Sequence, residues 1–300
     1  MAAASTAAIE ANNAAADAAR EARDEVLEKS AKTPVTAPAA SKTAAGPSNS
    51  RWDAFQVDVW ITDINAIEFG FWKKDRNKAK SRQFTSDMDI LGEVTENGER
   101  TGLIGYREDL WRTKSGMDKR LVFKLFGEKL NWHATMDLML GRSLQLTLGA
   151  HGFPVVAFSM NTGSHDQMVY IERSAHKWPW QPESFSFFLL ENGELDFYRL
   201  KRDMVAFGWD YTLYDQHDRV VGHIDSKLLT LGGRRKCRVL REHSDKRLHI
   251  VLKLFCGMLP FNAGCQKHIK SLYRQIRGGK LEPKLERQEA DLYMNPRRTR

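Results

Sequence analysis

The candidate binding residues of this chain are basic side chains in two short segments that alternate as strands do. Alternate residues of a strand share a face, so Arg199 is expected to project with Lys201, and Arg234 with Lys236 and Arg238. Arg235 is expected on the face of its apolar neighbour Cys237. Guanidinium forks and ammonium groups match the oxygens of a phosphate. On adjacent strands these cations would merge into an anion-binding patch; the alternative is that they are ordinary outward charges. The set comprises Arg199, Lys201, Arg202, Arg234, Arg235, Lys236 and Arg238.

The positive charge is placed unevenly along the chain, whose formal net charge is +8 at pH 7. Residues 199–300 carry 23 Lys and Arg against 11 Asp and Glu, whereas residues 51–198 carry 18 against 21. The excess therefore lies in the last third, where an anionic partner is expected, either a lipid headgroup or a nucleic acid. A solvated basic surface that serves only solubility is the alternative.

Common catalytic motifs are missing from the sequence. There is no G-x-S-x-G nucleophile elbow and no phosphate-cradling G-x-x-x-x-G-K-[ST] or G-x-G-x-x-G. His133 with Asp137, and His243 with His249, come nearest to metal-ligand spacing, but such spacings are common by chance. The sequence therefore predicts a protein without enzymatic activity, metal site or cofactor.

The cysteines and the apolar runs indicate a cytoplasmic protein. Cys237, Cys256 and Cys265 form no C-x-x-C pair and are expected to be buried, reduced thiols. No apolar run approaches the ~18 residues of a spanning helix, and the longest are interrupted by Lys253 and Pro260. The acidic N-terminal stretch argues against a transit peptide. We expect a cytoplasmic location, peripheral at a membrane if the ligand is a lipid.

Short alternating segments joined by turn residues predict an all-β barrel or sandwich with four hairpins. A first strand is expected over residues 55–61, with Phe55, Val57, Val59 and Ile61 on one face. Two hairpin turns contain Asn-Gly, which tolerates positive φ. The four predicted turns are Glu96–Glu99, Gly149–Gly152 between strands 144–148 and 155–159, Glu191–Glu194, and Asp215–Asp218.

Composition divides the chain into three parts. Residues 1–50 are an Ala/Pro-rich tail and linker, disordered or helical; residues 51–279 are the folded domain; residues 280–300 are a polar tail. The spacing of Ile269, Leu272 and Ile276 predicts a helix over residues 265–277 that stops at Gly278-Gly279.

A weak internal echo suggests two related halves. Asp118-Lys-Arg-Leu121 followed by Lys124-Leu-Phe126 recurs as Asp245-Lys-Arg-Leu248 followed by Lys253-Leu-Phe255. Chance is the alternative to duplication, because the intervening spacings differ.

The run of strand and turn patterns between residues 199 and 231 resembles the tubby C-terminal-like superfamily, and within it the LURP-one-related proteins. The segments that carry the likeness are residues 199–207, 211–215, 220–225 and 227–231. The resemblance implies a mostly β, closed antiparallel tubby-like β-barrel of about a dozen strands around a central apolar helix. It leaves open whether that helix is the one at residues 265–277 or an earlier one around residues 252–259.

The best-known members of that superfamily lack enzymatic activity; some relatives bind phosphoinositide headgroups and others are phospholipid scramblases. This chain lacks the acidic metal-binding segment and long terminal apolar helix of the scramblases, so that activity is not carried over. The prediction is a non-enzymatic protein that binds an anionic ligand, such as a phospholipid headgroup, through a basic C-terminal face. The alternatives are a nucleic-acid-binding accessory protein and a protein-interaction scaffold.

Overall fold

The computed structural model describes residues 51–59, 88–163, 168–175, 181–191, 194–203, 210–226 and 233–284. Predictions for the N-terminal tail and for residues 285–300 lie outside these ranges. The described residues from Trp52 onward all belong to one compact unit.

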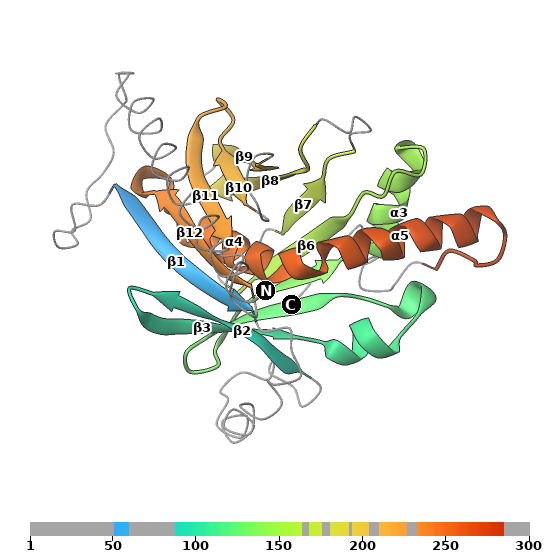
Figure 1. Ribbon diagram of the computed structural model, residues 1–300, viewed down its shortest axis with the longest axis horizontal. Coiled ribbons are helices and arrows are strands. Elements are labelled where there is room, and N and C mark those ends of the chain that lie inside the picture. Colours follow the sequence, from blue (N-terminus) through green and yellow to red (C-terminus); the bar gives the residue numbers. More distant parts are fainter. Residues whose placement is uncertain are drawn as a thin grey trace, which may run out of the picture. The chain divides into compact units, whose positions relative to one another are not determined.

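Twelve strands of the described residues close into one antiparallel β-barrel, which confirms the predicted fold class (Figure 1). Each strand pairs with its neighbours in the chain, and β1 closes the barrel against β12. Closure pairs the backbone groups that would otherwise form exposed sheet edges. The strands are β1 Trp52–Val59, β2 Asp89–Glu96, β3 Glu99–Tyr106, β4 Val122–Gly127, β5 Trp132–Leu138, β6 Ala157–Thr162, β7 Val169–Arg173, β8 Ser184–Glu191, β9 Glu194–Arg202, β10 Tyr211–Tyr214, β11 Val220–Ser226 and β12 Arg234–Leu240.

Three of the four predicted hairpins are confirmed. Asn97 and Gly98 join β2 to β3 with φ angles of 52° and 84°, the left-handed conformations that a type I′ turn requires. Asp215 organises the β10–β11 turn, because its Oδ1 accepts the backbone N–H groups of His217 and Arg219 at 2.9 Å each. Glu191 pairs with Glu194 at the end of the β8–β9 hairpin, whose two turn residues lie outside the described ranges.

The fourth predicted hairpin is wrong, because residues 140–149 form helix α3 (Leu140–Gly149). The alternation of leucines over residues 144–148 suggested a strand, yet Leu148 is 65% exposed. The buried positions instead recur at helical spacing, and two of them are polar. Ser143 Oγ accepts the N–H of Ala157 at 2.9 Å, and Thr147 Oγ1 accepts the N–H of Val155 at 3.0 Å. These bonds tie the helix to the chain that leads into β6.

The first strand is confirmed where it is described. Phe55, Val57 and Val59 of β1 are all buried, at 0–3% exposure, and face the barrel interior. Ile61 lies outside the described residues.

The central helix of the barrel is α4 (Lys246–Met258), which settles the choice that the sequence left open. It begins at Asp245, whose Oδ2 accepts the N–H groups of Arg247 at 2.7 Å and Leu248 at 3.1 Å, a standard N-cap. Ten of its thirteen residues are buried. Phe255 packs edge-on against Phe185 and Tyr211 of the barrel wall, with ring centroids 5.1 and 5.3 Å apart.

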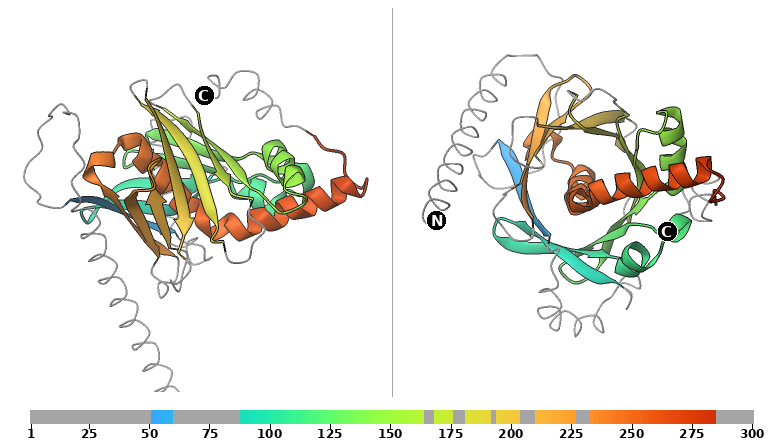
Figure 2. Two further views of the ribbon diagram at one scale, coloured as in Figure 1. Left: turned by 90° about the horizontal axis from the view of Figure 1, so that it is seen from above. Right: turned by 45° about the vertical axis from the view of Figure 1, so that its right-hand side comes forward.

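The predicted C-terminal helix is confirmed as α5 (Asn262–Arg277), which runs beside α3 rather than through the barrel (Figures 1 and 2). Ile269 and Leu272 are buried as expected, and the helix stops at Gly278. The 3₁₀ turn η5 (Leu259–Phe261) joins it to α4. The two barrel ends are named below as the α4 end, where α4 begins, and the α5 end, where α5 begins.

Pro260 lies in the 3₁₀ turn η5, which separates α4 from α5 without ending the run of helical turns. By length and composition alone, one described segment, Lys246–Arg277, is apolar enough to cross a membrane, with a window of mean hydropathy 1.4. That window is 67% buried in the protein, and a core helix gives the same signal, so it is weak evidence for a membrane span.

The internal echo has no structural counterpart. Its first copy ends the 3₁₀ turn η3 (Gly116–Asp118) and leads into strand β4, whereas its second copy caps and begins helix α4. The same four residues therefore take two conformations, set by what surrounds them.

Candidate anion-binding site

The predicted basic residues do not form one patch on adjacent strands. Arg199, Lys201 and Arg202 lie on β9 and the other four lie on β12, with β10 and β11 between them. At ~4.8 Å per strand, the two groups are about 14 Å apart along the sheet. The cations could merge into one patch only on adjacent strands, and the predicted β10–β11 hairpin lies between these two.

On β9, the predicted sharing of a face is confirmed for Arg199 and Lys201. Both cations lie 5.9 Å from the ring centroid of Tyr214 on the outer wall. Arg199 forms an exposed ion pair with Asp218. Arg202 takes the opposite face and pairs in register with the buried Tyr211.

On β12, the outward arginines have carboxylate partners. Arg234 Nε donates to Asp58 Oδ2 at 3.0 Å, and Arg238 Nη2 donates to Asp225 Oδ2 at 2.9 Å. Lys236 is exposed, and Arg235 is only 4% exposed and faces inward, as Cys237 does. An anion at the outer wall would therefore interact mainly with the lysines, because the outward arginines form ion pairs with carboxylates.

A pocket of about 370 Å³ opens at the α4 end, between α4 and strands β2 to β5. Val94, Leu125, Phe126 and Ile250 supply apolar lining. Such a space combines an apolar wall with a few polar groups, as ligand pockets commonly do.

One face of α4 brings the polar lining of this pocket together. Lys246, His249 and Lys253 stand at i, i+3 and i+7, so they share a face of the helix. Lys253 Nζ lies 2.5 Å from Glu96 Oε1 and 5.2 Å from the ring centroid of Phe55. His249 Nε2 and Ser244 Oγ share a hydrogen bond of 2.9 Å.

His133 closes the pocket from β5. It fits because Gly127 has no side chain: a Cβ there would lie 3.0 Å from His133 Nε2. Burial lowers the pKa of His133, and Lys246 and Lys253 lower it further by repulsion. Burial and then Lys253 likewise lower the pKa of His249. Both rings are therefore neutral at pH 7. The positive charge of the lysines acts on groups on both sides of the pocket.

The balance of charge in the pocket favours an anion. Among its lining residues, Glu96 is the one carboxylate, against the two lysines. Lys246 is exposed and has no ion pair with any described residue, whereas Lys253 is committed to Glu96. A negatively charged group would therefore meet one unpaired ammonium and two neutral rings that can donate hydrogen bonds.

Sequence reasoning missed Lys246 and Lys253 and weighed His249 only as a metal ligand. The signal was available in the helix itself. A helix enclosed by a barrel is expected to be apolar all round, so basic residues at i, i+3 and i+7 within it indicate a cavity along that face.

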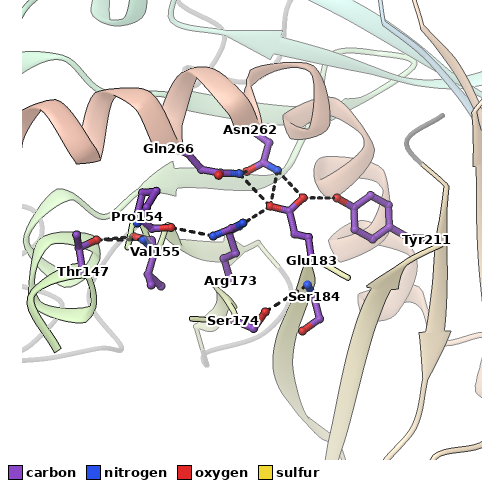
Figure 3. A network of polar contacts seen from close by, with 10 residues as sticks. All are labelled: Thr147, Pro154, Val155, Arg173, Ser174, Glu183, Ser184, Tyr211, Asn262 and Gln266. Atoms are coloured by element: carbon purple, nitrogen blue, oxygen red, sulfur yellow. Dashed lines mark hydrogen bonds and ion pairs between the residues drawn. The ribbon is translucent and has the colours of Figure 1, made fainter. Parts of the chain in front are cut away.

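A polar network at the α5 end links the barrel wall to α5 (Figure 3). Glu183, just before β8, accepts hydrogen bonds from four side chains. These are Arg173, Tyr211 at 2.9 Å, Asn262 at 3.1 Å and Gln266 at 2.9 Å. Burial by itself would raise the pKa of Glu183, but Arg173 and the hydrogen bonds outweigh it and hold the pKa below its usual value. These side chains hydrogen-bond to one another, which identifies the network as a structural joint between the barrel wall and α5.

The predicted buried thiols are confirmed: all three cysteines are buried and free. Burial raises the pKa of the Cys256 thiol to about 12, which suppresses its reactivity. Within the described ranges, no group of three or more His, Cys, Asp and Glu side chains is arranged to hold a metal ion.

Comparisons of this chain with models of protein families, with curated proteins and with solved structures found no match.

Proposed function

We propose that the barrel is a non-enzymatic binding protein for an anionic ligand, whose charged group occupies the pocket at the α4 end. One observation carries the proposal: the central helix presents Lys246, His249 and Lys253 on one face to a pocket that also has apolar wall. Ammonium groups on a pocket wall attract anions more strongly than fully exposed ones do, because the surroundings screen them less.

The ligand class is an anion with an apolar part. The polar groups gather around α4 and His133, while Val94, Leu125 and Phe126 leave apolar wall opposite. A phospholipid, whose headgroup is charged and whose chains are apolar, has this combination. The resemblance to tubby-like proteins agrees with that class and remains a prediction.

The outer wall supplies a secondary attraction in this proposal. Lys201 and Lys236 are exposed on β9 and β12, so they add to the positive field that an anionic surface meets. They stand on the wall and not at the pocket, which makes them a matched control for the pocket lysines.

The proposal is tested by sedimentation of the full chain with vesicles of phosphatidylcholine alone or with about a quarter phosphatidylserine. A basic residue near such an anionic surface contributes about 1 kcal/mol. Two variants of equal charge change are compared: Lys246→Gln with Lys253→Gln, and Lys201→Gln with Lys236→Gln. We expect binding that requires anionic lipid, is reduced on the order of tenfold in the pocket variant and is reduced less in the wall variant.

Three outcomes would count against the proposal. Equal losses in both variants would assign binding to surface charge instead of the pocket. Binding to duplex DNA that falls steeply with salt, without preference among lipids, would favour the nucleic-acid alternative. Absence of binding to either vesicle, with circular dichroism showing a folded protein, would remove the lipid ligand.

A further inference from the structure

Arg235 is a buried cation at the α5 end of the barrel. It is the second residue of β12 and pairs in register with Val57 and Ser226 of the neighbouring strands. Its side chain points inward with that of Cys237, and only 4% of the residue is exposed. Arginine keeps its charge in proteins, so a full positive charge lies inside the barrel wall.

The guanidinium of Arg235 makes very few contacts for its burial. Nη1 donates to the Gly233 carbonyl at 3.0 Å, and Nε is buried without a hydrogen-bond partner. No described residue forms an ion pair with it. A guanidinium has five N–H donors, and a buried charge that lacks both a counterion and hydrogen bonds is strongly disfavoured.

The free edge of this guanidinium is the one that binds oxyanions. Elsewhere in the chain, Arg107 uses its Nε and Nη2 together, each 3.0 Å from one oxygen of Asp109. In Arg235 that same edge, Nε with Nη2, donates to no described residue, while the Nη1 side is held by Gly233. The fork is thus oriented by the protein and lacks the pair of oxygens that it fits.

Nearby carboxylates are engaged elsewhere. Asp210 and Asp58 act on Arg235 only electrostatically. Oδ1 of Asp210 accepts the N–H and the Oγ–H of Ser226 at 2.6 and 2.7 Å, and Asp58 pairs with Arg234. Neither carboxylate occupies the fork of Arg235.

Gly233 shapes the local backbone for this arrangement. Its φ of +81° lies in the left-handed region, and a Cβ there would come within 3.3 Å of Nη1 of Arg235. A glycine therefore lets the guanidinium fold back against the start of β12 and keeps its other edge turned away from this carbonyl.

We infer that Arg235 is the binding residue of a second anion site, at the α5 end, which takes a phosphate or carboxylate group through a bidentate contact with Nε and Nη2. Arg202 adds positive charge to this site, since it also faces inward there and acts electrostatically on the same Tyr211 as Arg235. The site is separate from the pocket at the α4 end and does not depend on the function proposed for that pocket.

The test is calorimetric titration of the full chain carrying Lys246→Gln and Lys253→Gln, which removes the pocket lysines. The titrants are inorganic phosphate, glycerol 3-phosphate and acetate, with chloride at matched ionic strength as the reference. In this background, Arg235→Lys keeps the charge but removes the fork, Arg235→Met removes both, and Arg238→Gln is the matched control on the outer wall of the same strand.

We expect saturable binding of one oxyanion per chain, weakened on the order of tenfold or more by Arg235→Lys, abolished by Arg235→Met and unchanged by Arg238→Gln. Tighter binding of glycerol 3-phosphate than of inorganic phosphate would assign the site to a phosphate group on a larger molecule. The reverse order would assign it to the free ion, and preference for acetate would assign it to a carboxylate.

Equal affinity in the Arg235→Lys protein would overturn the bidentate contact. Titrations that do not differ between the parent and the Arg235→Met protein, or that show no binding to any oxyanion, would overturn the site itself. Arg235→Met is expected to fold, because it replaces an unpaired buried charge with an apolar side chain of similar length.

Discussion

Two arginines point inward at the same end of the barrel and have opposite surroundings. Arg173, the last residue of β7, bonds to the carboxylate of Glu183 and donates to the Pro154 carbonyl at 2.8 Å. Arg235, near the start of β12, donates to one carbonyl and to no carboxylate of the described residues. A buried cation paired with a carboxylate is part of the architecture, whereas one without a carboxylate partner is poised for a ligand.

Removing the carboxylate partner of Arg173 should have the largest effect on stability. Glu183→Ala removes the counterion of Arg173 and the acceptor of four side chains, so the free energy of unfolding should fall by about 3–5 kcal/mol. Urea denaturation measures it. Glu183→Gln, which keeps an acceptor for Tyr211 but leaves Arg173 uncompensated, should lie between this variant and the parent. A loss under about 1 kcal/mol in the alanine variant would show that the network is not a joint.

Replacing the unpaired arginine should have the opposite sign. Arg235→Met removes a buried charge without breaking an ion pair, so in a buffer free of oxyanions its free energy of unfolding should rise by about 1–4 kcal/mol or stay level. The same denaturation experiment decides it. A loss of about 3 kcal/mol or more would mean that Arg235 has a structural partner, and the contrast with Arg173 would fail.

The pocket offers a third cation environment, intermediate between these two. Lys253 is paired with Glu96, so Glu96→Gln should free its charge and tighten binding of anionic vesicles on the order of tenfold. Asp218→Asn likewise frees a cation, Arg199 on the outer wall, and should change binding much less. Weaker binding in the Glu96→Gln protein would show that the carboxylate holds the ligand or the pocket in place.

His268 is a buried base that, unlike the buried arginines, can lose its charge. Burial lowers the pKa of His268 to about 4, with repulsion from Lys119 next. Between pH 6.5 and about 4 the unfolded chain therefore binds a proton that the folded chain does not, and stability falls as the pH falls through this range. His268→Gln should lose less stability than the parent between pH 7.5 and 5. A decline as steep as that of the parent would assign the pH dependence to other groups.

The exposed outer pair gives the smallest expected effect. Arg199 and Asp218 have side chains 36% and 77% exposed, so Asp218→Asn should change the free energy of unfolding by less than about 1 kcal/mol. Asparagine also tolerates the φ of 57° at this position, which removes backbone strain as a cause. A change above 2 kcal/mol in thermal or urea unfolding would place this pair with the buried network.

Local chemistry made much of the wall predictable. The turn at Asn97-Gly98 and the turn organised by Asp215 depend on residues that adopt or support tight reverse turns wherever they occur. The alternation of Phe55, Val57 and Val59 reports a buried face in the same way. The same alternation misled over residues 144–148. Its leucines alternate as in a strand, but the first and last of them are also four residues apart, which is a helical spacing. Ser143 and Thr147 find their hydrogen-bond partners only in the folded protein.

The sequence by itself determined three of the β-hairpins, the period-two burial of β1 and the alternation that turns Arg235 to the face of Cys237, since these depend on neighbours a few residues away. Only the tertiary structure decided which helix fills the barrel and which cations have counterions. Those outcomes depend on groups far apart in the chain: Lys253 finds Glu96, and Arg173 finds Glu183, while Arg235 has no carboxylate partner among the described residues. Whether a basic residue is neutralised is therefore a property of the closed barrel rather than of its own segment.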